Sequence, residues 1–191
     1  MRKVVLDIET KNIFEDIGKA DPALLDISMV CIYDYATNEY SSYIEKELPQ
    51  LWPVLEKTDM LIGYNSDHFD IPLLNKYYHG DFTRIKSIDL LKEIKHVLGR
   101  RIRLNAVAEG TLGVRKSGKG LDAIKWWNSG EIDKLREYCL NDVKITKDIY
   151  DFVRAHGFIR FKDVSEMKEV KLDASEWEAE KNVSMTRSLP F

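Results

Sequence analysis

The stretch Val4-Val5-Leu6-Asp7-Ile8-Glu9-Thr10 decides the fold of this 191-residue chain. Four of its residues are aliphatic, which is typical of a buried central strand. Side chains alternate between the two faces of a strand, so Asp7 and Glu9 project from the same face, about 7 Å apart. Two carboxylates at the end of an apolar strand repel each other, and burial raises the pKa of each unless a cation lies between them. A lone Asp-x-Glu more often marks a solvated strand end, so the interpretation depends on the rest of the chain.

The composition is that of a globular protein, with 44% hydrophobic and 32% charged residues. The length suits one domain with a full core. No run of about 18 apolar residues occurs, and no basic-then-apolar leader, so we expect a cytoplasmic protein without a membrane span or signal peptide. The two cysteines, Cys31 and Cys139, have no C-x-x-C spacing, which favours reduced thiols and argues against a zinc site.

The charge is distributed unevenly along the chain. The net charge of −3 argues against a protein that simply coats nucleic acid. Residues 92–119, however, hold eight Lys or Arg residues against Glu93 and Glu109. Such a run is usually a solvated surface, but beside an acidic site it can hold a polyanion whose scissile end reaches the carboxylates. The eight cationic residues are Lys92, Lys95, Arg100, Arg101, Arg103, Arg115, Lys116 and Lys119.

Hydrophobic periodicity predicts an α/β sandwich with a mixed sheet of about five strands flanked by helices. The first three strands form an antiparallel meander, and the later ones rejoin the sheet through right-handed helical crossovers. From Phe161 the pattern fades, so we expect a domain over residues 1–160 and a tail or loosely docked appendage over 161–191. That appendage has no assigned role, and either docks through Trp177 and Phe191 or is disordered. After the first strand we expect strands at 26–35, 40–44, 60–64 and 84–90, helices at 48–57, 71–78, 91–98, 104–112 and 131–153, and an ambiguous segment at 121–127.

Three further polar residues lie at the start of expected helices or within them. Asp70 lies at the start of an expected helix, where the helix dipole favours the ionised carboxylate. Considered alone, it is an ordinary helix N-cap. Tyr138 and Asp142 are four residues apart on the longest expected helix and share one face. Considered alone, they are a buried tyrosine and a surface aspartate.

Taken together, the segments resemble the tyrosine branch (DEDDy) of the DEDD superfamily of 3′–5′ exonucleases. The resemblance is to the proofreading domain of family B DNA polymerases and to related stand-alone exonucleases, and it spans residues 3–153. Glu137 stands where the histidine branch has its histidine, so the tyrosine branch fits better. The matching segments are Asp7-Ile8-Glu9-Thr10; Gly63-Tyr64-Asn65 with Phe69-Asp70; Leu104-Asn105-Ala106-Val107-Ala108-Glu109 with Leu112-Gly113 and Lys116; and Tyr138-Cys139-Leu140-Asn141-Asp142.

The resemblance implies a ribonuclease-H-like fold and a phosphodiesterase site that uses two divalent metal ions, Mg²⁺ or Mn²⁺. Clustered carboxylates need cations to remain ionised, and hard oxygen ligands select Mg²⁺ or Mn²⁺ over zinc. Two such ions about 3.5–4 Å apart can stabilise both the attacking and the leaving oxygen. The implied catalytic residues are Asp7, Glu9, Asp70, Tyr138 and Asp142, of which all but Tyr138 are metal ligands.

Each of these residues has an expected role. Asp7 bridges both ions, and Glu9 and Asp142 hold the ion that activates water. Asp70 supports the second ion from the outer sphere. Tyr138 orients the attacking water, because the unperturbed pKa of a phenol, near 10, makes it a poor base.

We expect a separate set of residues to hold the terminal nucleotides by backbone contact and wedging. A base stacked on an aromatic ring gains roughly 1–3 kcal/mol whatever its identity, as an exonuclease requires. For Phe69 the alternative is plain core packing. Asp89 is better explained as a helix cap, and His68 as a solvated loop residue, than as extra ligands. The expected substrate-binding residues are Thr10, Asn65, Phe69, Leu104 and Asn105.

The predicted function is therefore metal-dependent 3′–5′ exonuclease activity on single-stranded nucleic-acid ends, with DNA favoured over RNA by resemblance only. The alternative from another class is a non-catalytic nucleic-acid-binding or scaffolding module on the same fold. A ribonuclease-H-type endonuclease ranks lower, because that site lacks the Tyr-x3-Asp pair. The chain has no polymerase palm or fingers segment, so we expect it to act on free ends or to serve a protein partner.

Overall fold

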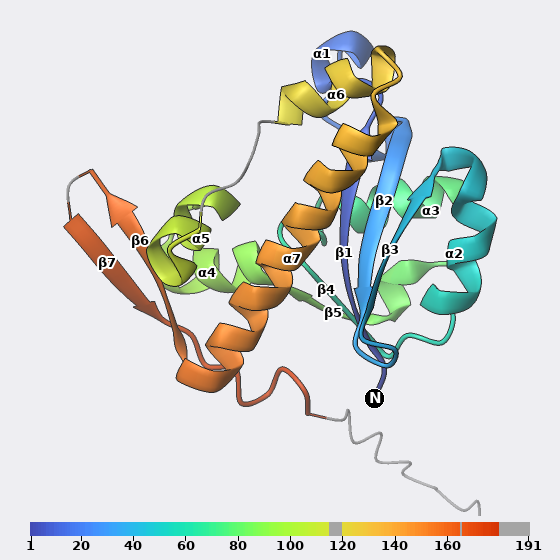
Figure 1. The fold of residues 1–191 in the computed structure, drawn as a ribbon. Coiled ribbons are helices and arrows are strands. Elements are labelled where there is room, and N and C mark those ends of the chain that lie inside the picture. The colour runs from blue at the N-terminus through green and yellow to red at the C-terminus, as the bar shows by residue number, and fades with distance from the viewer. Residues whose placement is uncertain (115–119, 165, 180–191) are drawn as a thin grey trace, which may run out of the picture.

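The computed structural model describes residues 1–114, 120–164 and 166–179. At its centre is a mixed sheet of five strands in the order β3-β2-β1-β4-β5 (Figure 1). β1 pairs antiparallel with β2, which pairs antiparallel with β3, while β1–β4 and β4–β5 are parallel. This confirms the predicted α/β architecture. The strands of this sheet are β1 (Lys3–Thr10), β2 (Ile27–Asp34), β3 (Glu39–Ile44), β4 (Met60–Gly63) and β5 (Lys86–Asp89).

The helices cover both faces of this sheet. α7 is the longest and crosses one face diagonally (Figure 1). α6 forms where the sequence is ambiguous, and α7 ends three residues later than expected. None of the helices in the described ranges is both long and apolar enough to cross a membrane. The helices are α1 (Phe14–Ile17), α2 (Leu48–Leu55), α3 (Asp70–Tyr77), α4 (Leu90–Leu98), α5 (Leu104–Leu112), α6 (Gly120–Asn128) and α7 (Ile132–His156), with 3₁₀ turns at Pro22–Leu24, Glu45–Glu47 and Phe82–Arg84.

Strand β1 separates two hydrophobic cores. Its Val4, Leu6 and Ile8 belong to the core that α2 and α3 cover. Val5 belongs to the core under α4, α5 and α7. Because side chains alternate along a strand, Asp7 and Glu9 follow Val5 and face α7. The alternation thus places both carboxylates on the face that α7 covers.

A second sheet of two antiparallel strands lies beside α5, apart from the main sheet (Figure 1). It consists of β6 (Phe158–Asp163) and β7 (Glu166–Lys171). α5 approaches β6 so closely that a Cβ on Gly110 would lie 2.5 Å from the carbonyl oxygen of Arg160. Glycine at position 110 therefore permits the contact.

The segment after β7 docks on the body of the protein. Trp177 is 4% exposed and its ring stacks on Tyr150 of α7, with 5.6 Å between centroids. The carboxylate of Glu178 accepts hydrogen bonds from Lys3 at 2.6 Å and from the Tyr150 hydroxyl at 2.7 Å, and pairs with Arg154 at 3.2 Å. These contacts tie residues 172–179 to α7 and to the start of β1.

The fading pattern after Phe161 predicted no strands there, whereas the structure forms β6 up to Asp163 and β7 over Glu166–Lys171. Of the β7 residues only Val170 is buried, so the strand carries almost no hydrophobic alternation to read. Docking through Trp177 is confirmed, whereas Phe191 lies outside the described residues. The expected division at residue 160 falls inside β6, and two separate units remain a prediction.

Candidate metal centre

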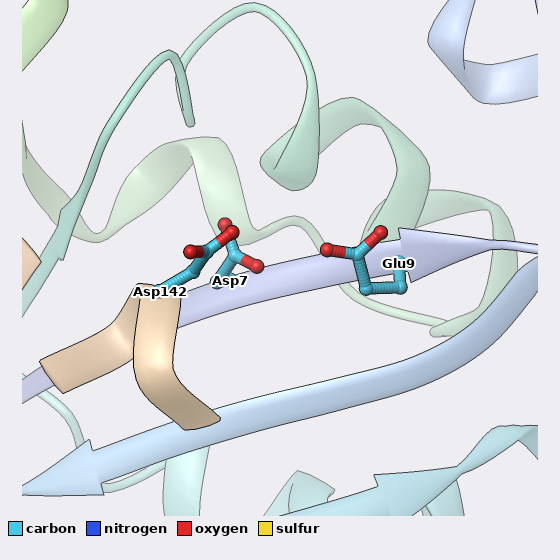
Figure 2. A group of neighbouring side chains, drawn as sticks. All are labelled: Asp7, Glu9 and Asp142. Carbon is cyan, nitrogen blue, oxygen red and sulfur yellow. The ribbon is translucent and has the colours of Figure 1, made fainter. Parts of the chain in front are cut away.

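Three carboxylates converge where α7 crosses β1. A ligand oxygen from each of Asp7, Glu9 and Asp142 lies within 4.8 Å of the others. Figure 2 shows Asp7 between the other two, with Asp7 and Glu9 extending from β1 and Asp142 extending from α7 toward Asp7. Asp142 is 2% exposed, and the other two are half-buried. The sequence prediction that two strand carboxylates meet one from the long helix is confirmed as geometry.

The chemistry of this cluster suits a divalent cation. Three anionic groups this close repel one another, and burial increases the cost of their charges. Oxygen-only donors are the ligand set of Mg²⁺ and Mn²⁺ rather than of zinc or copper. The three side chains therefore form a candidate divalent-metal centre.

The pairing of β1 with β2 is irregular at this centre, where β2 has one extra residue, Ser28, opposite the end of β1. The pairing with β2 runs in register from Val4 to Glu9 and shifts between Glu9 and Thr10. A bulge bends a strand and changes the direction of its side chains, and bulges are common beside active sites. The irregularity lies directly after the second carboxylate.

Cys139 of α7 contacts the first carboxylate. Its sulfur lies 3.8 Å from Oδ2 of Asp7 and 3.6 Å from the backbone oxygen of the same residue. Burial, followed by the neighbouring Cys31, raises the pKa of the Cys139 thiol. Cys31 is the cross-strand partner of Asp7 on β2. The Cys139 thiol therefore stays protonated beside Asp7, a contact that the sequence spacing of the two cysteines did not suggest.

Asp70 lies close to the cluster but outside the group of three. It is the first residue of α3 and is 4% exposed. Its carboxyl lies near enough to the backbone N–H of Ile8, the residue between Asp7 and Glu9, for that group to affect its pKa. Burial raises the pKa of Asp70 to about 8, against the lowering effect of backbone N–H groups. Its place at a helix start is confirmed, and its role as an outer-sphere ligand remains a prediction.

Tyr138 is one helical turn before Asp142 and is 2% exposed. The edge of the Trp126 ring from α6 packs against it, with 5.6 Å between ring centroids. A small hollow of about 160 Å³, lined by Trp126, Lys134, Glu137 and Tyr138, opens beside the ring. The predicted tyrosine is thus held in place from two helices.

A larger hollow of about 390 Å³ opens beside Glu9, and we call it the apolar hollow. Phe69 lines it from the loop before α3, and its ring meets Phe14 edge-on at 6.2 Å. The far wall comes from α6, whose Leu121 is 58% exposed. The lining includes Glu9, Thr10, Phe14, Phe69, Leu121 and Ile124. The sequence missed the contribution of α6, although Leu121 and Ile124 have the three-residue spacing of one helix face.

The other predicted substrate-binding residues are placed differently. The Thr10 hydroxyl lines the apolar hollow and donates to the backbone oxygen of Asn12 at 2.8 Å. Asn65 has a left-handed backbone with φ of 72°, and its side-chain oxygen accepts from Arg101 at 2.7 Å. Leu104 and Asn105 form the first turn of α5, and Leu104 packs on the core. Neither is among the described residues that line the apolar hollow.

For Asp89 and His68 the sequence favoured a helix cap and a solvated loop residue over extra metal ligands, and the structure agrees. Asp89 caps α4, since its carboxylate accepts the backbone N–H groups of Leu91 and Lys92. It also accepts the N–H of Asn65 at 2.7 Å and thereby fixes the loop before α3. His68 is exposed. Of the eight cationic residues at 92–119, those at 115, 116 and 119 lie outside the described residues.

Comparison with known proteins extends these observations. No curated protein matches the sequence of this chain. A family B DNA polymerase from the hyperthermophilic archaeon Pyrobaculum calidifontis has a similar fold, with a TM-score of 0.63 and 18% identity. The match covers 81% of this chain but only 24% of the polymerase, so the two share a fold over a minor part of that protein. The expected ribonuclease-H-like fold is confirmed by a family model that matches residues 4–154. With that model covering most of its length, the chain belongs to the ribonuclease H superfamily.

Proposed function

We propose that the protein is a metal-dependent 3′–5′ exonuclease that hydrolyses phosphodiester bonds at the 3′ ends of single-stranded nucleic acid, with DNA favoured over RNA. Membership of the ribonuclease H superfamily supports a nuclease-type hydrolase. The observation that carries the finer proposal is the cluster of Asp7, Glu9 and Asp142 directly beside the apolar hollow, which Glu9 and Phe69 share. A hollow of this kind suits an unpaired base, because aromatic and aliphatic walls accept any base.

The carboxylates would hold two divalent ions, Mg²⁺ or Mn²⁺. When bound, such ions lower the pKa of a coordinated water and neutralise charge on the phosphate. Asp7 lies between its neighbours and is suited to bridge both ions, with Glu9 and Asp142 on the ion that activates water (Figure 2). Asp70, whose carboxyl lies near the backbone of Ile8, would support the second ion from the outer sphere.

Tyr138 would orient the attacking water. Its ring is fixed by burial and by the edge contact with Trp126, so its hydroxyl has little freedom to move. A phenol with a pKa near 10 is a weak base at neutral pH. We therefore assign Tyr138 to positioning rather than to proton abstraction.

A non-catalytic binding module is the weaker candidate. A binder gains nothing from clustered carboxylates that repel each other and that would also repel a nucleic acid. The enzyme would act on free 3′ ends or as the nuclease of a complex with a protein partner.

The decisive experiment follows 5′-labelled single-stranded DNA and RNA of one sequence, with Mg²⁺ or Mn²⁺. We expect a ladder that shortens from the 3′ end and disappears with Asp7→Ala or a chelator. Asp133→Ala is the matched control, because Asp133 lies on α7 with its side chain 97% exposed. A circular strand, which has no 3′ end, should stay intact. Cleavage of the circle would indicate an endonuclease, and no cleavage by the folded protein would favour the binding module.

A further inference from the structure

A third hollow, which we call the basic hollow, lies on the other side of the loop before α3. Its volume is about 440 Å³. The walls come from this loop, from the first two turns of α4 and from the segment between α4 and α5. The polar residues that line it include Asn65, Asp67, His68, Lys92, Lys95 and Arg101. Three of its residues, Lys92, Lys95 and Arg101, belong to the cationic stretch at residues 92–119.

The acidic groups of the basic hollow are already engaged. Asp67 accepts a hydrogen bond from Lys92 at 2.6 Å and also accepts the hydroxyl of Ser87. The carboxylate of Asp89 is taken up by backbone N–H groups of the loop and of α4. Lys92 and Asp67 thus neutralise each other, and Asp89 serves as a cap.

Lys95 and Arg101 supply the remaining positive charge. Arg101 donates a hydrogen bond to the neutral side-chain oxygen of Asn65, at 2.7 Å. Both residues are exposed, and within the described part of the chain neither lies within ion-pair distance of a carboxylate. A guanidinium and an ammonium facing the same hollow form a site for an anion such as a phosphate.

The loop between β4 and α3 connects this hollow to the candidate metal centre. Asn65 at its start lines the basic hollow, and Phe69 at its end lines the apolar hollow. The two are joined by a single turn, since the N–H of Phe69 donates to the carbonyl oxygen of Asn65 at 3.0 Å. The next residue is Asp70. The cationic site and the candidate metal centre are therefore separated by a single turn of this loop. A single-stranded nucleic acid with its end at the carboxylates would have the cationic site close by.

We propose that the basic hollow binds a backbone phosphate of the single strand, away from the scissile bond. The inference rests on the proposed function, because it places the strand end at the carboxylates. A protein of net charge −3 with an acidic centre repels a polyanion unless local cations hold it. Lys95 and Arg101 provide that attraction, so the substrate is a strand long enough to reach both hollows.

The test is the salt dependence of binding, measured by fluorescence anisotropy of a labelled single-stranded DNA in chelator, where no hydrolysis occurs. For single strands, log K falls with log salt at about −0.7 per phosphate neutralised. Lys95→Gln should therefore make the slope less negative by about 0.7, and Lys95→Gln/Arg101→Gln by about 1.4. The matched control is Lys46→Gln/Lys57→Gln, since both lysines are exposed near the ends of α2 and the charge change is the same. The control should keep the wild-type slope.

Thermal unfolding verifies that each variant is folded, and Lys95→Gln breaks no side-chain contact in the described structure. The inference would be overturned if both hollow variants kept the wild-type slope of log K against log salt. It would also be overturned if the control variant showed the same change in slope, or if the wild type did not bind the strand at low salt. The outcome is independent of catalysis. A shifted slope without 3′ degradation would support the phosphate site and reject the exonuclease. Degradation from the 3′ end with unshifted slopes would support the exonuclease and reject the phosphate site.

Discussion

The sulfur of Cys139 lies 3.8 Å from the Oδ2 atom of Asp7, so a helix thiol supports the carboxylate at the middle of the acidic cluster. Burial keeps the thiol protonated, and a protonated thiol is a weak donor to a carboxylate. The contact also restricts the orientation of the Asp7 side chain, which faces α7. Cys139 is therefore a positioning residue for the candidate metal centre.

We expect Cys139→Ser, which keeps a donor, to retain metal affinity better than Cys139→Val, which removes it. Loss of a group that orients a ligand typically costs 10–100-fold in metal affinity or activity. Titration of Mn²⁺ by calorimetry measures the difference, and urea unfolding shows whether the fold is intact. Equal affinities for the two folded variants would show that the thiol has no orienting role.

Asp142→Asn should reduce exonuclease activity by more than about 100-fold, because it removes a ligand rather than a group that orients one. Its effect on the metal-free protein should be the opposite. Replacing one of three carboxylates within 4.8 Å relieves repulsion, so the Tm in chelator should stay constant or rise. Activity assays together with differential scanning calorimetry separate the two effects. A large fall in Tm would assign Asp142 a structural role instead.

Asp70 should make the stability of the metal-free protein depend on pH. Burial raises its pKa from 3.8 to about 8, so the native state holds a proton that the unfolded chain releases at lower pH. Its contribution to stability is present below pH 3.8 and is lost as pH rises toward 8. In chelator the Tm should fall across this window by at least about 2–4 °C, the change that 1 kcal/mol produces in a chain of this size.

Asp70→Asn should flatten that pH dependence, because the amide does not titrate. Mg²⁺ should flatten it in the wild type, since a cation nearby stabilises the ionised carboxylate. Tm measured across the pH range with and without Mg²⁺ gives both comparisons. A wild-type fall that persists unchanged in Asp70→Asn would assign the effect to other carboxylates.

Only part of the acidic site follows from local geometry in the sequence. Two carboxylates at i and i+2 share a strand face, and a tyrosine and an aspartate at i and i+4 share a helix face. Those rules place each pair on one face of its own element, whereas the meeting of the strand pair with the helix pair was implied only by the resemblance to the DEDDy exonucleases. The distance of Asp70 from the others depends on how β4 and α3 meet β1, and periodicity does not determine it.

The second sheet and the docked segment could not be predicted for a related reason. β7 buries little of itself, and the position of Trp177 depends on Tyr150, which lies on another element. Likewise the wall that α6 adds to the apolar hollow follows from tertiary packing. Such contacts leave no periodic pattern in the sequence.

Trp177→Ala should lower the free energy of unfolding by about 3 kcal/mol, as expected for loss of a buried aromatic side chain. The matched control is Met167→Ala at the exposed end of the second sheet, which should stay within about 0.5 kcal/mol of wild type. Met167 is 57% exposed, against 4% for Trp177. Urea denaturation measures both values. A cost below about 1 kcal/mol for Trp177→Ala would mean that residues 172–179 contribute little to the fold.

Phe69→Ala distinguishes substrate contact from core packing. The ring is half-buried, contacts Phe14 at its edge and lines the apolar hollow beside Glu9. If it stacks on a terminal base, the loss of roughly 1–3 kcal/mol raises KM for single strands by about 5- to 150-fold, with a smaller change in kcat. Phe69→Leu is the matched control, because it keeps most of the apolar side-chain volume without offering an aromatic face. Steady-state kinetics on a single strand and the Tm of each variant decide between the roles: a raised KM at constant Tm in both variants supports stacking. A fall in Tm for Phe69→Ala that Phe69→Leu restores, with KM unchanged, would make Phe69 a core residue.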